Sequence, residues 1–245
     1  GLERTREVLD EKGMILTGSF VSPDQKELSY PLILEKNGIL LAMLNYTYGT
    51  NSLVAETPNI INYIDTLLIR QDIQKVKLVA PDFIIACVHW GKEYQREENT
   101  TQVSIAEFLF SQGVDAIIGS HPHVVQPVRF KKENSFYKQP IVYSLGNFIS
   151  NQRNRYRNGG IIFAMELEKT DSTRITGLDY LPVYVHKPEL DEKYSFHLVP
   201  SGIPDTMMEK IGFTEDEKAT YLEFCEDTRV HLSDTPRNSY YQKQD

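Results

Sequence analysis

The sequence lacks an excess of positive charge. Lys and Arg together number 26, against 34 Asp and Glu, so the formal net charge is -8 and the pI is near 5.3. Non-specific nucleic-acid binding needs a basic surface to meet the phosphate backbone. The acidic balance therefore argues against a nucleic-acid partner.

Cysteine and long apolar runs are also scarce. The two cysteines, Cys87 and Cys225, make no disulfide framework and leave the redox compartment open. No run reaches the roughly 18 apolar residues of a membrane-spanning helix. The first 13 residues, GLERTREVLDEKG, lack the apolar stretch of a signal peptide. The 245 residues are enough for one large domain or two small ones.

Hydrophobic periodicity and turn residues predict an α/β protein. Strands are expected over residues 14–19, 31–47 (a hairpin that turns at Asn37-Gly38), 82–89, 114–119, 124–130, 139–148, 160–168 and 175–186. Helices are expected over residues 2–12, 70–80, 99–112 and near 214–227. Residues 82–119 form the clearest unit, since two apolar runs flank a helix that opens with a capping-box pair, Asn99 and Gln102. This order predicts two parallel strands joined by a right-handed crossover.

Histidines follow both apolar strands of this unit. His89, in VHWGKEY, ends the first strand, while His121 and His123, in GSHPHVVQ, come directly after the second. Ligands of open α/β sheets collect beyond the carboxyl ends of the strands. Three imidazoles at one such edge suit zinc or a similar ion, although a lone histidine at a strand end is more often a polar loop residue. Pro122 is expected to hold His121 in an extended backbone.

Several other residues near these strand ends allow two interpretations. Glu93 either fixes an imidazole tautomer or is a solvated carboxylate. Asn147, in YSLGNF, either donates to a bound anion or is a turn residue. The arginines within residues 153–157 either meet an anionic substrate or form a solvated face. Trp90 and Tyr94 are interpreted as packing aromatics rather than ligand-stacking rings, and His186, His197 and His231 as structural or surface residues.

VHWGKEY, GSHPHVVQ and YSLGNF, in this order and at these separations, resemble the signature blocks of a bacterial capsule-biosynthesis family. It is the family typified by CapA, or PgsA, the poly-gamma-glutamate capsule group of the calcineurin-like metallophosphatase superfamily. The resemblance covers roughly residues 2–168. It implies a four-layer α/β/β/α sandwich with a metal site at one edge. Residues 1–184 would be the C-terminal portion of such a domain, and residues 185–245 an extension packed on it.

The resemblance also implies roles for individual residues. His89 matches the family's isolated ligand histidine, and His121 and His123 match its Gly-His-x-His block, with Ser120 inserted before the first histidine. These three would be ligands of a divalent metal (Mn, Zn or Fe). His89, His121 and Glu93 would be catalytic, and Asn147 and Ser120 would bind substrate. In the wider superfamily two metals hold a bridging hydroxide that attacks phosphorus.

The earlier family blocks have no counterpart in this sequence. These are an Asp after the first strand, an acidic motif after the second, and an Asn-Asn-His block before a helix that resembles residues 2–12. We therefore expect a fold without its N-terminal strands and a half-site whose metal is weakly bound or absent. The missing strands would expose a sheet edge that allows a homo-oligomer. Membrane association would depend only on N-terminal parts outside this sequence.

The function implied by the resemblance is capsule or exopolymer biosynthesis of the poly-gamma-glutamate type. It would operate at the bacterial cell envelope, outside the cytoplasm, on an anionic polymer or a phosphorylated small molecule. One alternative is an active metal-dependent phosphoester hydrolase, with Glu93 or a second chain completing the site. Another is a non-catalytic cell-surface assembly protein that retains the fold. The sequence leaves open whether the chain is an enzyme.

Overall fold

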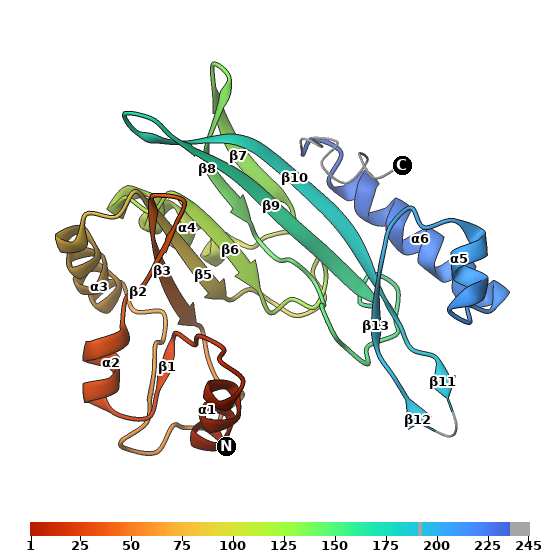
Figure 1. The fold of residues 1–245 in the computed structure, drawn as a ribbon, viewed down its shortest axis with the longest axis horizontal. Coiled ribbons are helices and arrows are strands. Elements are labelled where there is room, and N and C mark those ends of the chain that lie inside the picture. The colour runs from red at the N-terminus through yellow and green to blue at the C-terminus, as the bar shows by residue number, and fades with distance from the viewer. Residues whose placement is uncertain (191–192, 236–245) are drawn as a thin grey trace.

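A computed structural model describes residues 1–190 and 193–235 of the chain (Figure 1). Its helices are α1 (Leu2–Glu11), α2 (Pro23–Ser29), α3 (Thr66–Val79), α4 (Thr100–Gln112), α5 (Asp205–Lys210) and α6 (Glu215–His231). Its first strands are β1 (Ser19–Phe20), β2 (Leu32–Lys36), β3 (Ile39–Thr47), β4 (Ile60–Ile61), β5 (Phe83–His89) and β6 (Ala116–Ser120). The later strands are β7 (Val128–Glu133), β8 (Phe136–Val142), β9 (Gly159–Lys169), β10 (Thr173–His186), β11 (Glu189–Leu190), β12 (Lys193–Tyr194) and β13 (His197–Pro200). The mixed α/β class expected from the sequence is confirmed.

Nine strands form one curled sheet that runs through the molecule. Its main path is β13-β10-β8-β6-β5-β3-β2, with β7 added on β8 and β9 on β10. The strands β3, β5, β6 and β8 are mutually parallel, and the strands added around them are antiparallel. The long β9-β10 ribbon crosses the molecule and connects the parallel centre to α5 and α6 (Figure 1). The carboxyl ends of the parallel strands therefore share one edge.

The β5–α4–β6 unit forms as the sequence predicts. Asn99 and Gln102 make a reciprocal capping box at the start of α4, and Gly113 ends that helix in a left-handed conformation (φ 99°). β5 and β6 then pair in parallel, with His89 opposite Ser120. The turn of the β2–β3 hairpin at Asn37-Gly38 is also confirmed.

Two groups of buried side chains account for most of the packing. The larger lies around the parallel strands and helices α3 and α4: Phe20, Tyr30, Ala42, Leu44, Tyr46, Ile69, Ile73, Val76, Ile84, Ala86, Val88, Trp90, Ala106, Leu109, Val114, Ile117, Ile141 and Tyr143. The second joins α5 and α6 to β10 and β13: Tyr184, Val199, Met208, Phe213, Tyr221, Phe224 and Cys225. The division of the chain at residue 184 stays a prediction. Within the described residues, no helix combines the length and the apolar composition that crossing a bilayer requires.

Some local predictions were wrong. Residues 14–18 are not a strand, because β1 covers only Ser19–Phe20 and pairs with the short β4. The helix expected over residues 70–80 begins earlier, at Thr66, because Asp65 caps it by accepting hydrogen bonds from two backbone N–H groups. The short helix α2, capped by Ser22, was not predicted at all. Its seven residues contribute no buried side chain, so it carries no apolar stripe to detect.

Candidate metal-binding histidine edge

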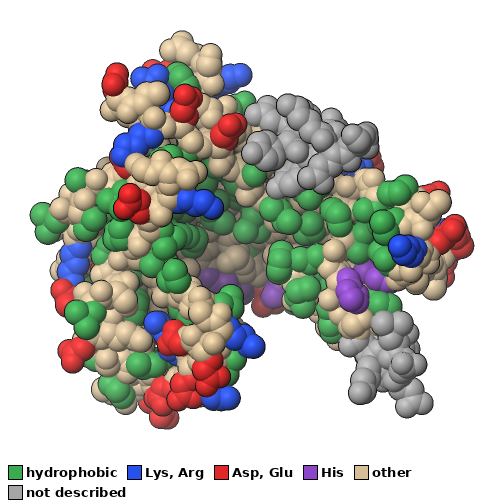
Figure 2. Space-filling view, in the orientation of Figure 1, with side chains coloured by type: hydrophobic (Ala, Val, Ile, Leu, Met, Phe, Trp, Pro, Cys, Tyr) green, Lys and Arg blue, Asp and Glu red, His purple; other side chains and the backbone are tan. Residues whose placement is uncertain are grey.

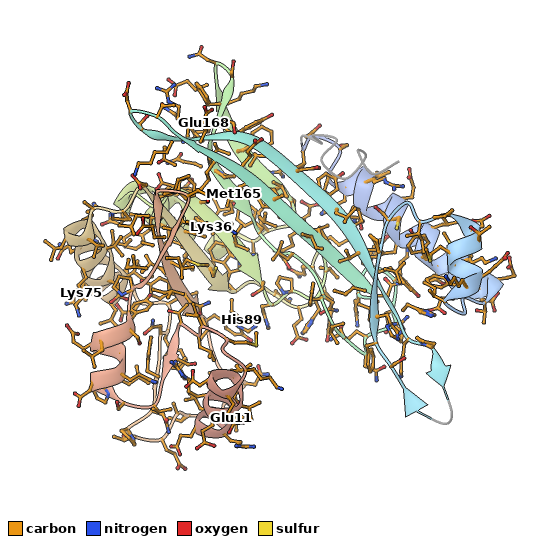
Figure 3. All side chains as sticks on the ribbon, in the orientation of Figure 1. Glu11, Lys36, Lys75, His89, Met165 and Glu168 are labelled. Atoms are coloured by element: carbon orange, nitrogen blue, oxygen red, sulfur yellow. The ribbon has the colours of Figure 1, made fainter. Side chains whose placement is uncertain are left out.

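Three neighbouring parallel strands end at the candidate site. Thr47, His89 and Ser120 are the last residues of β3, β5 and β6, and the register places them side by side. Figure 3 labels His89 beside the ends of the central strands. The space-filling view shows histidine surface within a recess between the N-terminal and C-terminal parts (Figure 2). These strand ends therefore lie at one edge of the sheet, as the strand-end rule predicts.

His89, His121 and His123 lie together, as predicted. The ring centroids of His89 and His121 are 4.6 Å apart, and those of His121 and His123 are 6.2 Å apart. The first pair meets edge to face. His186 and His197 lie elsewhere, on β10 and β13, and His231 ends α6.

The backbone of the HPH segment was predicted wrongly. His121 has φ 106° and His123 has φ 60°, so His121 is not in the extended conformation that a following proline favours. Non-glycine residues seldom adopt positive φ, and when they do the strain is often found at functional sites. Tyr94, in the neighbouring loop, has φ 67° and donates its backbone N–H to the Pro122 carbonyl at 2.7 Å. The two loops therefore fix each other in these conformations.

Hydrogen bonds orient two of the three rings. Nδ1 of His89 lies 3.0 Å from the Thr47 hydroxyl, and Nδ1 of His123 lies 2.9 Å from Oδ1 of Asn147. The Asn147 amide nitrogen donates to the carbonyls of His123 and Arg157, which leaves its oxygen as the acceptor for His123. Nδ1 of His123 therefore carries the proton, and its Nε2 has a free lone pair. Such partners orient metal-binding histidines in many proteins.

Burial favours the neutral form of His89 and of His121. Desolvation lowers the pKa of His89, and the nearby His121 and His123 lower it further. Desolvation also lowers the pKa of His121, and the negative charge of Glu93 opposes that effect. The neutral ring is the form that binds metal ions. Glu93 is exposed, and no hydrogen bond joins it to a histidine among the described residues, so both interpretations of this carboxylate stay predictions.

Two exposed tyrosines flank the cluster. The Tyr48 ring lies 4.5 Å from that of His121 and 5.7 Å from that of His89, and the Tyr94 ring lies 6.0 Å from that of His123. Tyr94 is 41% exposed and packs on His123 at the surface, and its interpretation as a packing aromatic rather than a ligand-stacking ring stays a prediction. Trp90 is a packing residue, since its ring is buried and its Nε1 donates to the Tyr143 carbonyl at 2.9 Å.

Thr47 and Tyr48 were missed by the sequence analysis. Thr47 ends β3 and Tyr48 follows it, and only the parallel pairing of β3 with β5 brings them to this edge. Ser120 is where the resemblance placed it, at the end of β6, with its carbonyl accepting from the Trp90 N–H at 3.0 Å. This backbone hydrogen bond positions the loop that follows β5. It does not involve the Ser120 side chain, whose role in substrate binding stays a prediction.

The donor chemistry of the cluster fits a divalent metal ion. The Thr47 hydroxyl donates to the Gly49 carbonyl at 2.8 Å, so it accepts from Nδ1 of His89 and leaves Nε2 of that ring free. Nε2 of His123 is free for the same reason, and the His121 ring neighbours both rings. Among residues 1–190 and 193–235, however, no three His, Cys, Asp or Glu side chains form a group ready to hold an ion. The metal-ligand and catalytic roles of these residues therefore stay predictions.

Solved structures with a similar chain path include two nucleotidases. One is titled "Putative 5'-Nucleotidase from Staphylococcus aureus", with a TM-score of 0.46, 14% identity, and coverage of 93% of this chain and 39% of that one. The other is NAD nucleotidase (NadN) of Haemophilus influenzae, with a TM-score of 0.43, 12% identity, and coverage of 87% of this chain and 40% of that one.

Sequence relatives are found among capsule proteins. The PGA biosynthesis protein CapA of Bacillus subtilis (strain 168) is 29% identical over 184 residues, which are 72% of this chain and 46% of the relative. The capsule biosynthesis protein CapA of Bacillus anthracis is 32% identical over 136 residues, 53% of this chain and 31% of the relative. The chain thus matches less than half the length of each. The sequence profile described as "Bacterial capsule synthesis protein PGA_cap" matches residues 1–152, more than half of the chain and all three histidines. The chain is therefore a member of this bacterial capsule synthesis protein family.

Proposed function

We propose that this chain serves the biosynthesis of an anionic capsule polymer of the poly-gamma-glutamate type. We further propose that the histidine edge, formed by His89, His121 and His123, is its functional site. Membership of the PGA_cap family and the names of the two Bacillus relatives support the first part. The observation that carries the second is the pair of oriented rings, His89 on Thr47 and His123 on Asn147. A histidine with a purely structural role does not need a free Nε2 on the side of the ring opposite its hydrogen-bonded Nδ1.

In this proposal His89, His121 and His123 hold a divalent ion, either Mn, Zn or Fe. When bound, such an ion supplies positive charge that polarises a phosphoryl or carbonyl oxygen. Desolvation favours the neutral form of His89 and His121, which is the form that binds metal. Three imidazoles without a bridging carboxylate hold one ion more easily than two, since two ions repel each other. We therefore expect weak binding and slow turnover.

The chain's own groups would then divide the remaining tasks. Glu93, whose charge acts on His121, can accept a proton beside the cluster. Asn147 orients His123, and with Ser120 it is our candidate for contact with the substrate. The substrate is an anionic polymer or a phosphorylated small molecule, processed at the cell envelope outside the cytoplasm. A homo-oligomer could form through the edge strands β2 or β13.

The metal part is tested by calorimetry with Zn²⁺ and Mn²⁺ on the wild-type chain, on His123→Ala and on a control, His197→Ala. The control removes an exposed histidine of β13 that lies outside the cluster. We expect binding that His123→Ala weakens strongly and His197→Ala leaves unchanged. Equal binding by all three proteins would remove the histidine edge from the proposal.

Two further assays separate the candidate functions. Efficient hydrolysis of p-nitrophenyl phosphate that disappears in His123→Ala would identify the chain as a complete phosphoesterase. The cellular test replaces the matching region of the Bacillus subtilis relative with this chain and measures polymer production. Restoration by wild type and not by His123→Ala supports the proposal. Equal restoration by both would favour the non-catalytic assembly role.

A further inference from the structure

Three arginines at positions 153, 155 and 157 follow the Asn147 segment, and two of them are engaged by the C-terminal part of the chain. Arg155 donates to both carboxylate oxygens of Asp227, at 2.8 and 2.9 Å, and lies 3.4 Å from Glu223. Arg153 donates to the Val185 carbonyl at 2.7 Å and to the Tyr184 hydroxyl at 3.1 Å. These two side chains connect the loop to β10 and α6. Their charges and N–H groups are already used within the fold.

Arg157 is different, because its guanidinium lies against the histidine edge. Its central carbon is 3.5 Å from the centroid of the Tyr94 ring, and the Tyr94 ring stacks with His123. In the part of the chain that the structure describes, Arg157 forms no ion pair with a carboxylate, unlike Arg155. It is also partly buried, whereas Arg153 and Arg155 are exposed. A partly desolvated cation without a counter-ion is a favourable place for an incoming anion.

The position of Arg157 is fixed before any ligand arrives. Asn147 donates to its carbonyl at 2.7 Å and contacts Nδ1 of His123 at 2.9 Å, so one amide connects Arg157 to the cluster. The Arg157 N–H also donates to the Asn154 carbonyl at 3.0 Å. Preorganisation of this kind lowers the entropy cost of binding.

The loop that carries Tyr94 is held just as firmly. Gln126 is fully buried, accepts from the Gln102 side chain at 2.8 Å, and donates to the carbonyls of Gln95 and Glu97. A side-chain hydrogen bond with Glu93 raises the pKa of Tyr94, and among the described residues no ion pair joins Glu93 to Arg157. The aromatic ring therefore presents a fixed surface to the guanidinium.

We propose that Arg157, seated on Tyr94, is an oxyanion-binding site beside the histidine edge. The guanidinium contacts the ring through cation–π attraction, which leaves its N–H groups free. A planar fork of N–H donors matches a carboxylate or a phosphate group with two parallel hydrogen bonds. Arg157 would hold one anionic group of the substrate while the next group of the same substrate contacts the histidines. This role in substrate binding rests on the proposed function.

The test compares Arg157→Gln, Arg157→Lys and the control Arg155→Gln with wild type. All four proteins are titrated at one ionic strength with inorganic phosphate and, separately, with glutarate, and then with Mn²⁺ alone. We expect Arg157→Gln to lose about tenfold or more in oxyanion affinity, as for a lost charge-assisted hydrogen bond. Arg157→Lys should keep part of the affinity, since it keeps the charge without the fork. Arg155→Gln removes the same charge and should bind the anion as wild type does.

The two anions distinguish the source of the ligand, a carboxylate polymer or a phosphate ester. The Mn²⁺ titration separates this proposal from the previous one. If no protein binds Mn²⁺ but Arg157→Gln still loses the anion, the oxyanion site stands and the metal role fails. Unchanged anion affinity in Arg157→Gln would overturn the site, as would an equal loss in Arg155→Gln or no binding by wild type. Should Arg157→Gln fail to fold, Arg157→Lys decides by the same comparison with Arg155→Gln.

Discussion

His123 and Asn147 hold each other in a fixed arrangement across 24 residues of sequence. The amide oxygen of Asn147 accepts from Nδ1 of His123 at 2.9 Å, and the amide nitrogen donates to the His123 carbonyl at 3.3 Å. Asn147 is 8% exposed, so water competes little for these bonds. The side chain therefore sets both the tautomer and the direction of the His123 ring.

Asn147→Ala should separate ring orientation from folding. We expect metal affinity to fall by about 10–100-fold, the usual cost of losing a partner that orients a ligand. The matched control is Asn154→Ala, at an exposed position of the neighbouring loop. Calorimetry with Zn²⁺ measures the affinity, and urea unfolding measures stability. Unchanged affinity in a folded Asn147→Ala protein would show that the amide does not orient a ligand.

Gly119 should tolerate no side chain. A Cβ built at this position of β6 would lie 2.1 Å from the Tyr143 carbonyl oxygen and 2.6 Å from Nε1 of Trp90. Because Trp90 donates to that same carbonyl, the substitution has to break the bond or shift the strand. We expect Gly119→Ala to lower the free energy of unfolding by about 1–3 kcal/mol or more. The control Gly49→Ala, with open space around its Cβ, should change it little. Equal urea unfolding midpoints for Gly119→Ala and wild type would contradict the predicted clash.

The strand-end site was predictable because its signals are local. β5 and β6 are apolar runs that end in histidines, and the capping box of α4 fixes the crossover between them. The side-by-side position of His89 and Ser120 then follows from parallel pairing.

The remaining features depend on contacts distant in sequence. Thr47 reaches His89 across 42 residues, through the pairing of β3 with β5. The positive φ of His121 is maintained by the fold around it, against the local preference that Pro122 imposes. Arg157 differs from Arg155 only in which groups the fold places beside it. No periodicity or local motif encodes such partners.

His186 should be essential for attaching the C-terminal helices. The ring is 1% exposed; Nδ1 lies 2.8 Å from the Glu217 carboxylate on α6, and Nε2 lies 2.9 Å from the Ile211 carbonyl after α5. The ring also stacks on Phe213 at 4.3 Å. Replacement by Ala leaves a partly buried carboxylate without this partner and opens a cavity.

We expect His186→Ala to lower the free energy of unfolding by about 2–4 kcal/mol. The control His197→Ala, at an exposed histidine of the paired strand, should cost far less. Hydrogen exchange should show the greatest loss of protection in α5 and α6. Protection lost evenly over the whole sheet would instead mean that the C-terminal helices do not open separately.

His231 should make part of the chain's stability depend on pH. Its Nε2 donates to the Arg96 carbonyl at 3.1 Å, a bond that by itself raises the pKa of the ring. Burial lowers its pKa, the positive charges of Arg96 and Arg129 lower it further, and Glu97 opposes them. The unfolded chain therefore takes up this proton near the ordinary value of 6.5, before the folded chain does. The unfolded state binds more protons in that range, so the contribution of His231 to the free energy of unfolding falls as the pH drops below about 6.5 and is constant above it. His89 and His121, whose pKa values are lowered as well, add to the same dependence of stability on pH.

His231→Gln should therefore reduce, in part, the slope of the free energy of unfolding against pH between pH 7.5 and 5. The exposed control, His197→Gln, should keep the wild-type slope. Urea unfolding at a series of pH values measures both. Identical slopes for His231→Gln and wild type would show that His231 is protonated equally in the folded and unfolded chain.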